Sequence, residues 1–189
     1  LLNDLKGQVE NTVRISQNDN LITIGNRSFH EKKIIDADSN FFTFFSFPLI
    51  KGNPETVLQD SHSIVLTETT AKKYFGNIES AFGKTVLLDK DIPLKVTGIA
   101  KDVPSNAHLE FDLVIPLENY EDKSWMTTWI NNGIYTYIKL LPGITKARVE
   151  KQLPGFIEKY LGSDLRKYGF HWTLSLTPLK EIYFETPAE

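Results

Sequence analysis

A run of aromatic residues from Asp38 to Gly52, DSNFFTFFSFPLIKG, sets the strongest requirement on the fold, because it needs a substantial core to enter. It contains five phenylalanines: Phe41, Phe42, Phe44, Phe45 and Phe47. Ser39 can cap a short helix here, and spacings of three and four then turn Phe41, Phe44 and Phe45 inward. Each buried ring removes roughly 150–250 Å² from water. We therefore predict that this turn is the core of one subdomain and not a ligand cage.

Composition narrows the class of protein. The chain has 189 residues, of which 41% are hydrophobic and 24% charged, as expected of one globular domain or two small ones. A net charge of −3 gives no basic field for nucleic acid, so we expect no nucleic-acid partner. The absence of cysteine excludes disulfides, thiolate metal sites and cysteine nucleophiles.

The sequence contains no run of about 18 apolar residues that could cross a bilayer, and its first eight residues lack the pattern of a signal peptide. It begins abruptly with LLNDLKGQVENTVRI. We therefore expect a fragment of something larger that is soluble by itself.

The first half of the chain predicts strands around one helix. Val9–Ser16 and Leu21–Ile24 are expected to pair as a hairpin through Asn18-Asp19-Asn20, and a third strand follows over Arg27–Ala37. Further along, Thr67 is a good N-cap for a helix over Glu68–Phe75 that Gly76 ends. Two later strands, Lys84–Leu88 and Leu94–Val103, predict a second hairpin through Asp89-Lys90-Asp91.

The second half predicts a strand–helix–strand unit. Leu109–Ile115 alternates as a strand with one apolar side, and Gly133–Leu141 is a strand that Pro142-Gly143 ends. The longest helix begins after Thr145 and should kink at Pro154, and the last strand is His171–Leu179. This order favours an α+β fold that ends in a split βαβ unit.

The best candidate for a metal or acid–base cluster is His108, Glu110 and Asp112. Alternate residues of a strand share one face and could converge on one ion. The opposite face is hydrophobic, however, and solvent-facing strand positions are normally polar. Because a fourth ligand is also missing, we favour a structural role for these residues and predict no metal site.

Other catalytic motifs fail on their context. The four histidines, His30, His62, His108 and His171, are far apart in sequence and form no zincin motif. No G-x-S-x-G nucleophile elbow occurs. Gly83-Lys84-Thr85 resembles the end of a P-loop, but Ile78 stands where the first glycine belongs, and a strand should follow.

Three segments carry a resemblance to a known family. They are DADSNFFTFFSFPLIKGNPETVL (Asp36–Leu58), SIVLTETTAKKYFGN with GKTV (Ser63–Asn77 and Gly83–Val86), and VTGIAKDVPSNAHLEFDLVIP (Val96–Pro116). In this order and spacing they resemble the extracytoplasmic core domain of MacB-type, FtsX-like ABC transporter permeases, particularly Bacteroidetes-like members. YTYIKLLPGITKARVEKQLPGFIEKY and LTPLKEIYF fit as well, so the resemblance spans about Asp4 to Phe184.

The resemblance implies a domain inserted between the first and second transmembrane helices of a permease. Both chain ends, Leu1–Ile35 and Asn131–Glu189, would form a porter-like βαβ subdomain, and Asp36–Ile130 would form an inserted mixed α/β subdomain. It implies structural roles for matched residues: core for Phe41, Phe44, Phe45 and Phe47, a cap for Thr67, turns for Gly76 and Gly83, and turn or strand-entry positions for Asn106 and His108.

The resemblance also implies a function without chemistry in this chain. A separate cytoplasmic ABC ATPase domain or subunit hydrolyses ATP, and the permease acts as a dimer with a second copy or a paralogue. Motion would pass through the inner membrane to this domain on the periplasmic side. There it would serve export or act on an extracytoplasmic partner, for which a periplasmic or outer-membrane protein is a candidate. No Walker motif is present, and no catalytic, cofactor or metal site carries over.

Two other functions remain open at this stage. A free-standing extracytoplasmic binding module would use an exposed sheet edge or the Trp125 and Trp129 region of the irregular segment Glu118–Asn132, and it would carry a signal peptide but no permease helices. A metal-dependent hydrolase would use His108, Glu110 and Asp112. It would contain stoichiometric metal that the His108→Ala variant loses.

Overall fold

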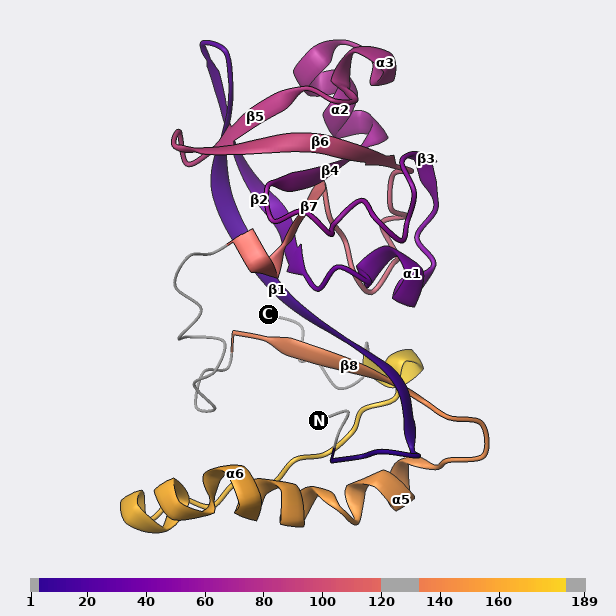
Figure 1. Ribbon diagram of the computed structural model, residues 1–189, viewed down its shortest axis with the longest axis vertical. Coiled ribbons are helices and arrows are strands. Elements are labelled where there is room, and N and C mark those ends of the chain that lie inside the picture. Colours follow the sequence, from indigo (N-terminus) through magenta and orange to yellow (C-terminus); the bar gives the residue numbers. More distant parts are fainter. Residues whose placement is uncertain (1–3, 120–132, 183–189) are drawn as a thin grey trace. The chain divides into compact units, whose positions relative to one another are not determined.

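The computed structural model describes residues 4–119 and 133–182 of the chain, and it confirms an α+β fold. Figure 1 labels its elements. The strands are β1 (Val9–Ile24), β2 (Arg27–Ala37), β3 (Leu49–Lys51), β4 (Ser63–Thr67), β5 (Thr85–Leu88), β6 (Ile92–Ala100), β7 (Leu113–Pro116) and β8 (Tyr135–Leu140). The helices are α1 (Phe41–Phe45), α2 (Glu68–Phe75), α3 (Ile78–Ala81), α5 (Lys146–Glu150) and α6 (Leu153–Tyr168), with 3₁₀ turns at Leu117–Asn119 and Leu179–Glu181.

The chain forms two compact units. Unit 1 consists of Leu1–Thr12 and Ile138–Glu189, and unit 2 consists of Val13–Tyr137. These bounds differ from those expected of the two subdomains, because β1 and β2 pair along most of their length and belong together. The chain passes from one unit to the other inside β1 and again inside β8. The division into a porter-like subdomain and an inserted subdomain therefore stays a prediction.

Unit 2 contains a closed ring of six strands. β1 pairs with β2, β2 with β7, β7 with β4, β4 with β6, β6 with β5, and β5 with β1 again through Ile22 and Thr23. The β2–β7 and β4–β6 pairs are parallel, and the others are antiparallel. Closing a sheet on itself leaves these strands without a free edge.

Successive residues of these strands face two different hydrophobic clusters. Ile34 and Leu113 belong to a cluster that draws on all six strands together with α2 and α3. Their neighbours Ile35 and Val114 belong to a second cluster, which α1 joins. Figure 1 shows α2 and α3 on one side of the strands and α1 on the other. The prediction of one apolar side for Leu109–Ile115 is therefore wrong, because β7 is buried on both faces.

The phenylalanine turn is part of the core, as predicted, but its inward set differs. Phe41 and Phe42 are 0% and 1% exposed, whereas Phe44 and Phe45 are only partly buried. The rings form a network in which Phe41 contacts Phe42, Phe45, Phe47 and Phe111 at centroid distances of 5.2 to 5.7 Å. Ser39 is not the cap: Asn40 holds that position, without a side-chain hydrogen bond.

The predicted hairpin at Asn18–Asn20 is also wrong. β1 continues through these residues as one strand of 16 residues, and the pairing with β2 shifts register between Asn18 and Asn20. A β-bulge accepts an extra residue inside a ladder, so turn-forming residues do not by themselves end a strand. The chain turns instead at Gly25-Asn26, where Gly25 has a φ of 58°.

The middle of unit 2 follows the predictions closely. Thr67 caps α2 by accepting a hydrogen bond from the Thr70 N–H, and Gly76 ends the helix. β5 and β6 form the predicted hairpin, with Leu88 opposite Ile92. A strand and not a helix follows Gly83-Lys84, as the failed P-loop match predicts.

Unit 1 combines β8, the beginning of β1, two helices and an extended segment. Thr145 caps α5 as predicted, but the long helix divides into α5 and α6, and Pro154 stands in the first turn of α6. Proline is favoured there because the first N–H groups of a helix have no partner within it. The predicted kink is therefore a new helix start.

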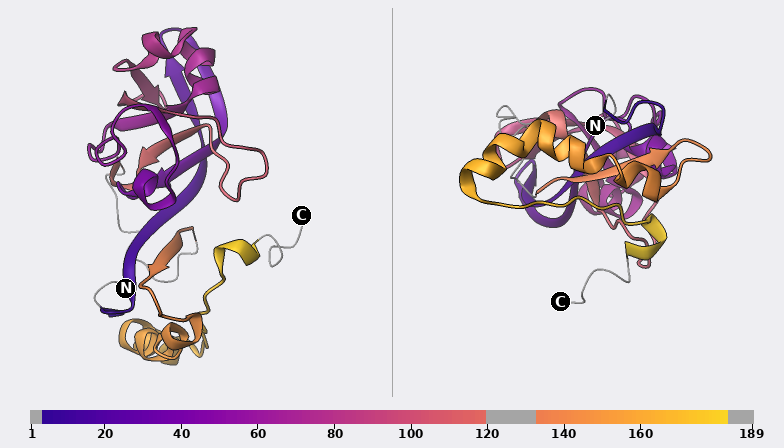
Figure 2. Two further views of the ribbon diagram at one scale, coloured as in Figure 1. Left: turned by 90° about the vertical axis from the view of Figure 1, so that its right-hand side faces the viewer. Right: turned by 90° about the horizontal axis from the view of Figure 1, so that it is seen from below.

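The predicted last strand, His171–Leu179, is not a strand. The Leu176 N–H donates to the Glu150 carboxylate at 2.9 Å. The Leu176 side chain still packs on the cluster of Leu5, Val9 and Val149. Figure 2 shows the segment running back along α6.

Candidate functional site

The structure separates the predicted cluster of His108, Glu110 and Asp112. Only Asp112 lies next to β7, which begins at Leu113, so the three residues do not alternate along one strand. His108 Nε2 lies 2.7 Å from the Tyr137 hydroxyl. Glu110 forms an ion pair with Lys33 instead. Among residues 4–119 and 133–182, no three histidine, cysteine or acidic side chains are placed to hold a metal ion.

Burial affects the ionisation of two members of this set. It lowers the pKa of His108, which favours the neutral imidazole. Burial, followed by the charge of Glu31, raises the pKa of Asp112. These shifts have local causes and do not require a shared ion.

Glu31 on β2 is a buried charged group of unit 2 that the sequence analysis did not single out. Its side chain is 5% exposed and accepts hydrogen bonds from Lys73 Nζ and the Tyr74 hydroxyl, both at 2.7 Å. The Phe29 ring packs on Tyr74 at 5.0 Å. Burial and the bond to Glu31 raise the pKa of Tyr74 far above its usual value. The network ties β2 to α2, and its carboxylate is neutralised in place, which is the arrangement of a structural ion pair.

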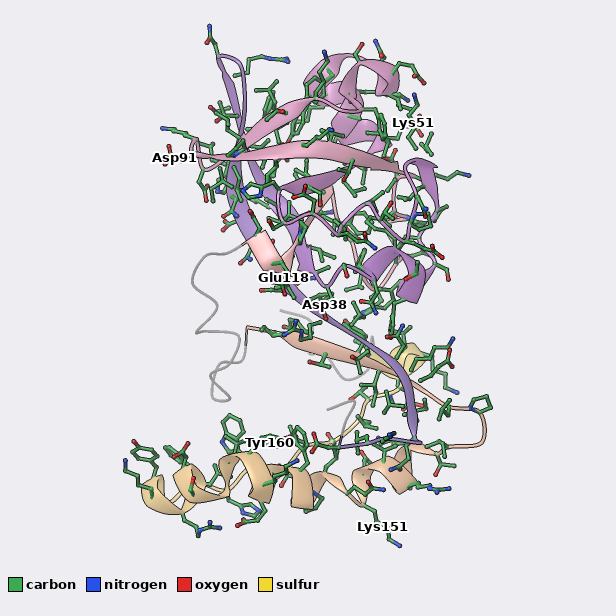
Figure 3. All side chains as sticks on the ribbon, in the orientation of Figure 1. Asp38, Lys51, Asp91, Glu118, Lys151 and Tyr160 are labelled. Carbon is green, nitrogen blue, oxygen red and sulfur yellow. The ribbon has the colours of Figure 1, made fainter. Side chains whose placement is uncertain are left out.

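A second ionic contact holds the beginning of the phenylalanine turn. Arg14 on β1 donates to both carboxylate oxygens of Asp38, and the Asp38 side chain also accepts from the Arg14 N–H at 2.8 Å. The bond to Asp38 raises the pKa of Arg14. Figure 3 labels Asp38 beside Glu118, the acidic residue whose charge also acts on Arg14. This clamp fixes where α1 leaves the sheet.

The remaining predicted positions are scattered. His30 lies 3.6 Å from Asp19, and His62 contacts Ser61 and Asp60, so these histidines occupy separate surface positions. His171 follows α6 in unit 1. Trp125 and Trp129, the proposed contact region of a binding module, lie outside the described residues.

Unit 1 carries a groove of about 760 Å³ along α6. Its apolar lining includes Ile157 and Leu165 from the helix and Phe170, Trp172 and Leu174 from the segment that returns along it. The sequence analysis missed this groove because it placed those last residues in a sheet. A mainly apolar concavity of this size can hold a small molecule or a peptide segment.

Polar groups border the groove and the helix. Glu150, Glu158 and Arg166 contribute to the lining, and the last two form an ion pair. Figure 3 shows Tyr160 and Lys151 projecting to different sides of the stretch from α5 to α6.

Within the described residues, no helix is long and apolar enough to span a bilayer.

The comparison with models of protein families finds one match. The sequence profile described as MacB-like periplasmic core domain matches residues 2–156. No curated protein sequence matches the chain.

Solved structures of low sequence identity share the fold. A permease domain from Porphyromonas gingivalis is 20% identical, with a TM-score of 0.75 over 97% of this chain and 84% of that one. The periplasmic region of MacB from Actinobacillus actinomycetemcomitans is 19% identical, with a TM-score of 0.62 over 97% and 79%. The extracellular domain of the noncanonic ABC-type transporter YknZ from Gram-positive bacteria is 15% identical, with a TM-score of 0.55 over 94% and 87%.

Proposed function

The chain belongs to the family of MacB-like periplasmic core domains, the periplasmic domains of ABC transporter permeases, and from this membership we propose that it couples cytoplasmic ATP hydrolysis to work outside the inner membrane. The profile match over residues 2–156 is the observation that carries the proposal. The work is export of a substrate or action on a periplasmic or outer-membrane partner. The permease pairs with a second copy or a paralogue, and its ATPase is a cytoplasmic domain or subunit.

Two features of the chain support a mechanical role. Both chain ends belong to unit 1, and the two crossings into unit 2 lie inside β1 and β8 instead of in loops. A displacement applied at the ends therefore enters unit 2 through hydrogen-bonded strands. The buried carboxylate of Glu31 in unit 2 also forms an ion pair with Lys73 that joins β2 to α2. Such a unit can transmit force without rearranging internally.

The parent reading frame tests this proposal directly. We expect one apolar helix of about 20 residues just before Leu1 and three more after Glu189. A parent frame without these helices would remove the proposal. A signal peptide in their place would favour a free-standing binding module, for which the groove along α6 is the supporting observation.

A functional test uses the intact permease. Replacing the chain by a short flexible linker should leave ATP hydrolysis measurable but abolish the coupled work, because the energy source lies in another domain. The matched control is a permease with Phe82→Ser, an exposed residue in unit 2. Undiminished export by the linker variant would contradict the coupling role.

A further inference from the structure

The two connections of unit 2 to the rest of the chain end in the same hydrophobic cluster. Unit 2 begins at Val13 and ends at Tyr137. Val13 is fully buried in the cluster that α1 joins, and Tyr137 packs against that cluster too. Among the residues that the structure describes, neither belongs to the other cluster, which is formed with α2 and α3. A force that reaches unit 2 along the chain therefore arrives on the α1 side of its core.

On the entry side, Arg14 follows Val13 on β1 and is bound to the start of the phenylalanine turn. Its guanidinium donates to both carboxylate oxygens of Asp38, with the closest pair of atoms 2.7 Å apart. The backbone of Asp38 takes part as well, because its N–H donates to the Arg14 carbonyl at 3.0 Å. A bidentate pair between arginine and a carboxylate fixes geometry in addition to charge. The entering strand and the first residue of the turn are thus held together.

On the exit side, Tyr137 contacts the other end of α1. Its ring packs edge-on against that of Phe45, the last residue of the helix, at a centroid distance of 5.1 Å. Its hydroxyl lies 2.7 Å from His108 Nε2. Burial raises the pKa of Tyr137 to about 12, so this hydroxyl stays protonated at neutral pH. The strand that leaves unit 2 is therefore attached to α1 by a ring contact, and a hydrogen bond holds that ring in place.

The two sides of the core differ in how their helices are held. α1 has only five residues, too few for its own hydrogen bonds to stabilise it, so its position depends mainly on packing. α2 has eight residues, is capped by Thr67, and donates a further bond from the Thr69 N–H to the Asp102 carboxylate at 2.9 Å. Glu31 ties it to β2 as well. α1 is therefore the helix of unit 2 that is more sensitive to what its neighbours do.

We propose that α1 is the joint through which force on the chain ends enters unit 2, and that Arg14 and Tyr137 are the positioning residues that attach the two crossings to it. Both crossings continue into unit 1, which contains both chain ends. Because one short helix is attached to both, a force between β1 and β8 loads α1 before it reaches the α2 side of the core. The inference rests on the proposed function and names the residues by which unit 2 receives the force.

Amide hydrogen exchange in the full chain can test this coupling. Val149→Ala shortens a fully buried side chain in a cluster that consists of unit 1 residues only, so it perturbs unit 1 directly. The Phe44 amide, which donates to the Asn40 carbonyl at 2.8 Å, reports on α1. The Gly76 amide, which donates to the Lys72 carbonyl at 2.8 Å, reports on α2. Nuclear magnetic resonance measures both amides in one sample.

The Val149→Ala chain should exchange faster in α1 and not in α2. We expect exchange at Phe44 to rise by at least about threefold and exchange at Gly76 to stay unchanged. With Arg14→Met and Tyr137→Leu together, the same substitution in unit 1 should change exchange of the α1 amide by less than about 1.5-fold. Tyr137→Phe keeps the ring contact and should keep most of the response. Comparing each background with and without Val149→Ala cancels the direct effect of the background, so a purely structural role gives no difference.

Matched changes elsewhere in unit 2 provide the controls. Phe29→Leu removes a ring that packs on Tyr74 at 5.0 Å, and Lys33→Met breaks an ion pair with Glu110. The response of α1 to Val149→Ala should survive both, because neither change touches a crossing. If a background variant does not fold, the comparison of the α1 and α2 amides in the chain that carries only the unit 1 substitution still decides the matter.

Three outcomes would overturn the inference. They are no change at Phe44, equal increases at Phe44 and Gly76, and an increase at Phe44 that is the same in every background, which would show that the coupling bypasses Arg14 and Tyr137. The proposed function fails separately, when the parent frame lacks membrane helices. That result would remove the link to ATP hydrolysis and leave the exchange measurement as it stands, whereas a parent with those helices and an unresponsive α1 would overturn only the joint.

Discussion

Phe41 and Phe44 belong to the same short helix but differ in burial. Phe41 is fully buried among four other rings, whereas Phe44 is only partly buried and contacts Phe45. We expect Phe41→Ala to lower the free energy of unfolding by about 3–5 kcal/mol, because it removes a buried ring and leaves a cavity. Phe44→Ala should cost clearly less. Urea unfolding followed by circular dichroism measures both, and equal losses would show that α1 is packed differently.

The lowered pKa of His108 predicts that the stability of unit 2 depends on pH. Burial lowers its pKa below the ordinary value of 6.5, so the folded state prefers the neutral imidazole. The unfolded state then binds more protons as the pH falls below about 6.5. The stability that this residue contributes is complete above that pH and is lost as the pH falls through the folded pKa.

Comparing variants isolates this effect. Between about pH 7.5 and 5.5 the chain should lose stability, and His108→Gln should remove part of that loss. His62→Gln is the matched control, because it removes an exposed imidazole of the same unit. Urea midpoints at several pH values provide the measurement. Identical slopes for the chain and His108→Gln would refute the role of this partly buried imidazole.

At the scale of elements, the sequence predicted those that local chemistry fixes. Thr67 and Thr145 are caps, and their side chains accept the hydrogen bonds that the position requires. Elements that depend on tertiary pairing were predicted less well. Asn18–Asn20 carries the composition of a turn, but pairing with β2 keeps it in a strand. Alternation in Leu109–Ile115 could not show that β7 is covered on both faces.

The same distinction applies to the candidate site. His108, Glu110 and Asp112 share one face only if a strand includes all three, and that strand begins at Leu113. The Glu31 network could not be predicted, because its partners Lys73 and Tyr74 lie 42 and 43 positions away.

The break between α5 and α6 gives a test at this scale. In the interior of a helix, Pro154→Ala would restore a hydrogen bond and raise stability by about 3 kcal/mol. In the first turn of α6, where the structure places it, the substitution should be neutral or destabilising by less than about 1 kcal/mol. Thermal unfolding distinguishes these results. A large gain in stability would instead support the predicted continuous helix with a kink at Pro154.

At the scale of the whole molecule, the two units differ in how their cores are built. The strand pairings that close the ring of unit 2, and both of its hydrophobic clusters, lie within one continuous segment of the chain. Unit 1 joins two segments from opposite ends of the chain around the small cluster of Leu5, Val9 and Val149, together with the buried face of α6. Its folding therefore depends on unit 2 to bring the ends of the chain together.

This difference predicts which unit folds alone. Residues 13–137 should give a cooperative thermal transition and well-dispersed amide resonances, because their core and strand pairings are complete. The two segments of unit 1, joined by a short linker from Thr12 to Ile138, should not, because a single core in a chain below about 70–80 residues rarely supplies enough stability. The full chain is the control in both experiments. A cooperative transition in the joined unit 1 would show that this unit folds without unit 2. The closed strand ring would then not be needed to bring the two ends of the chain together.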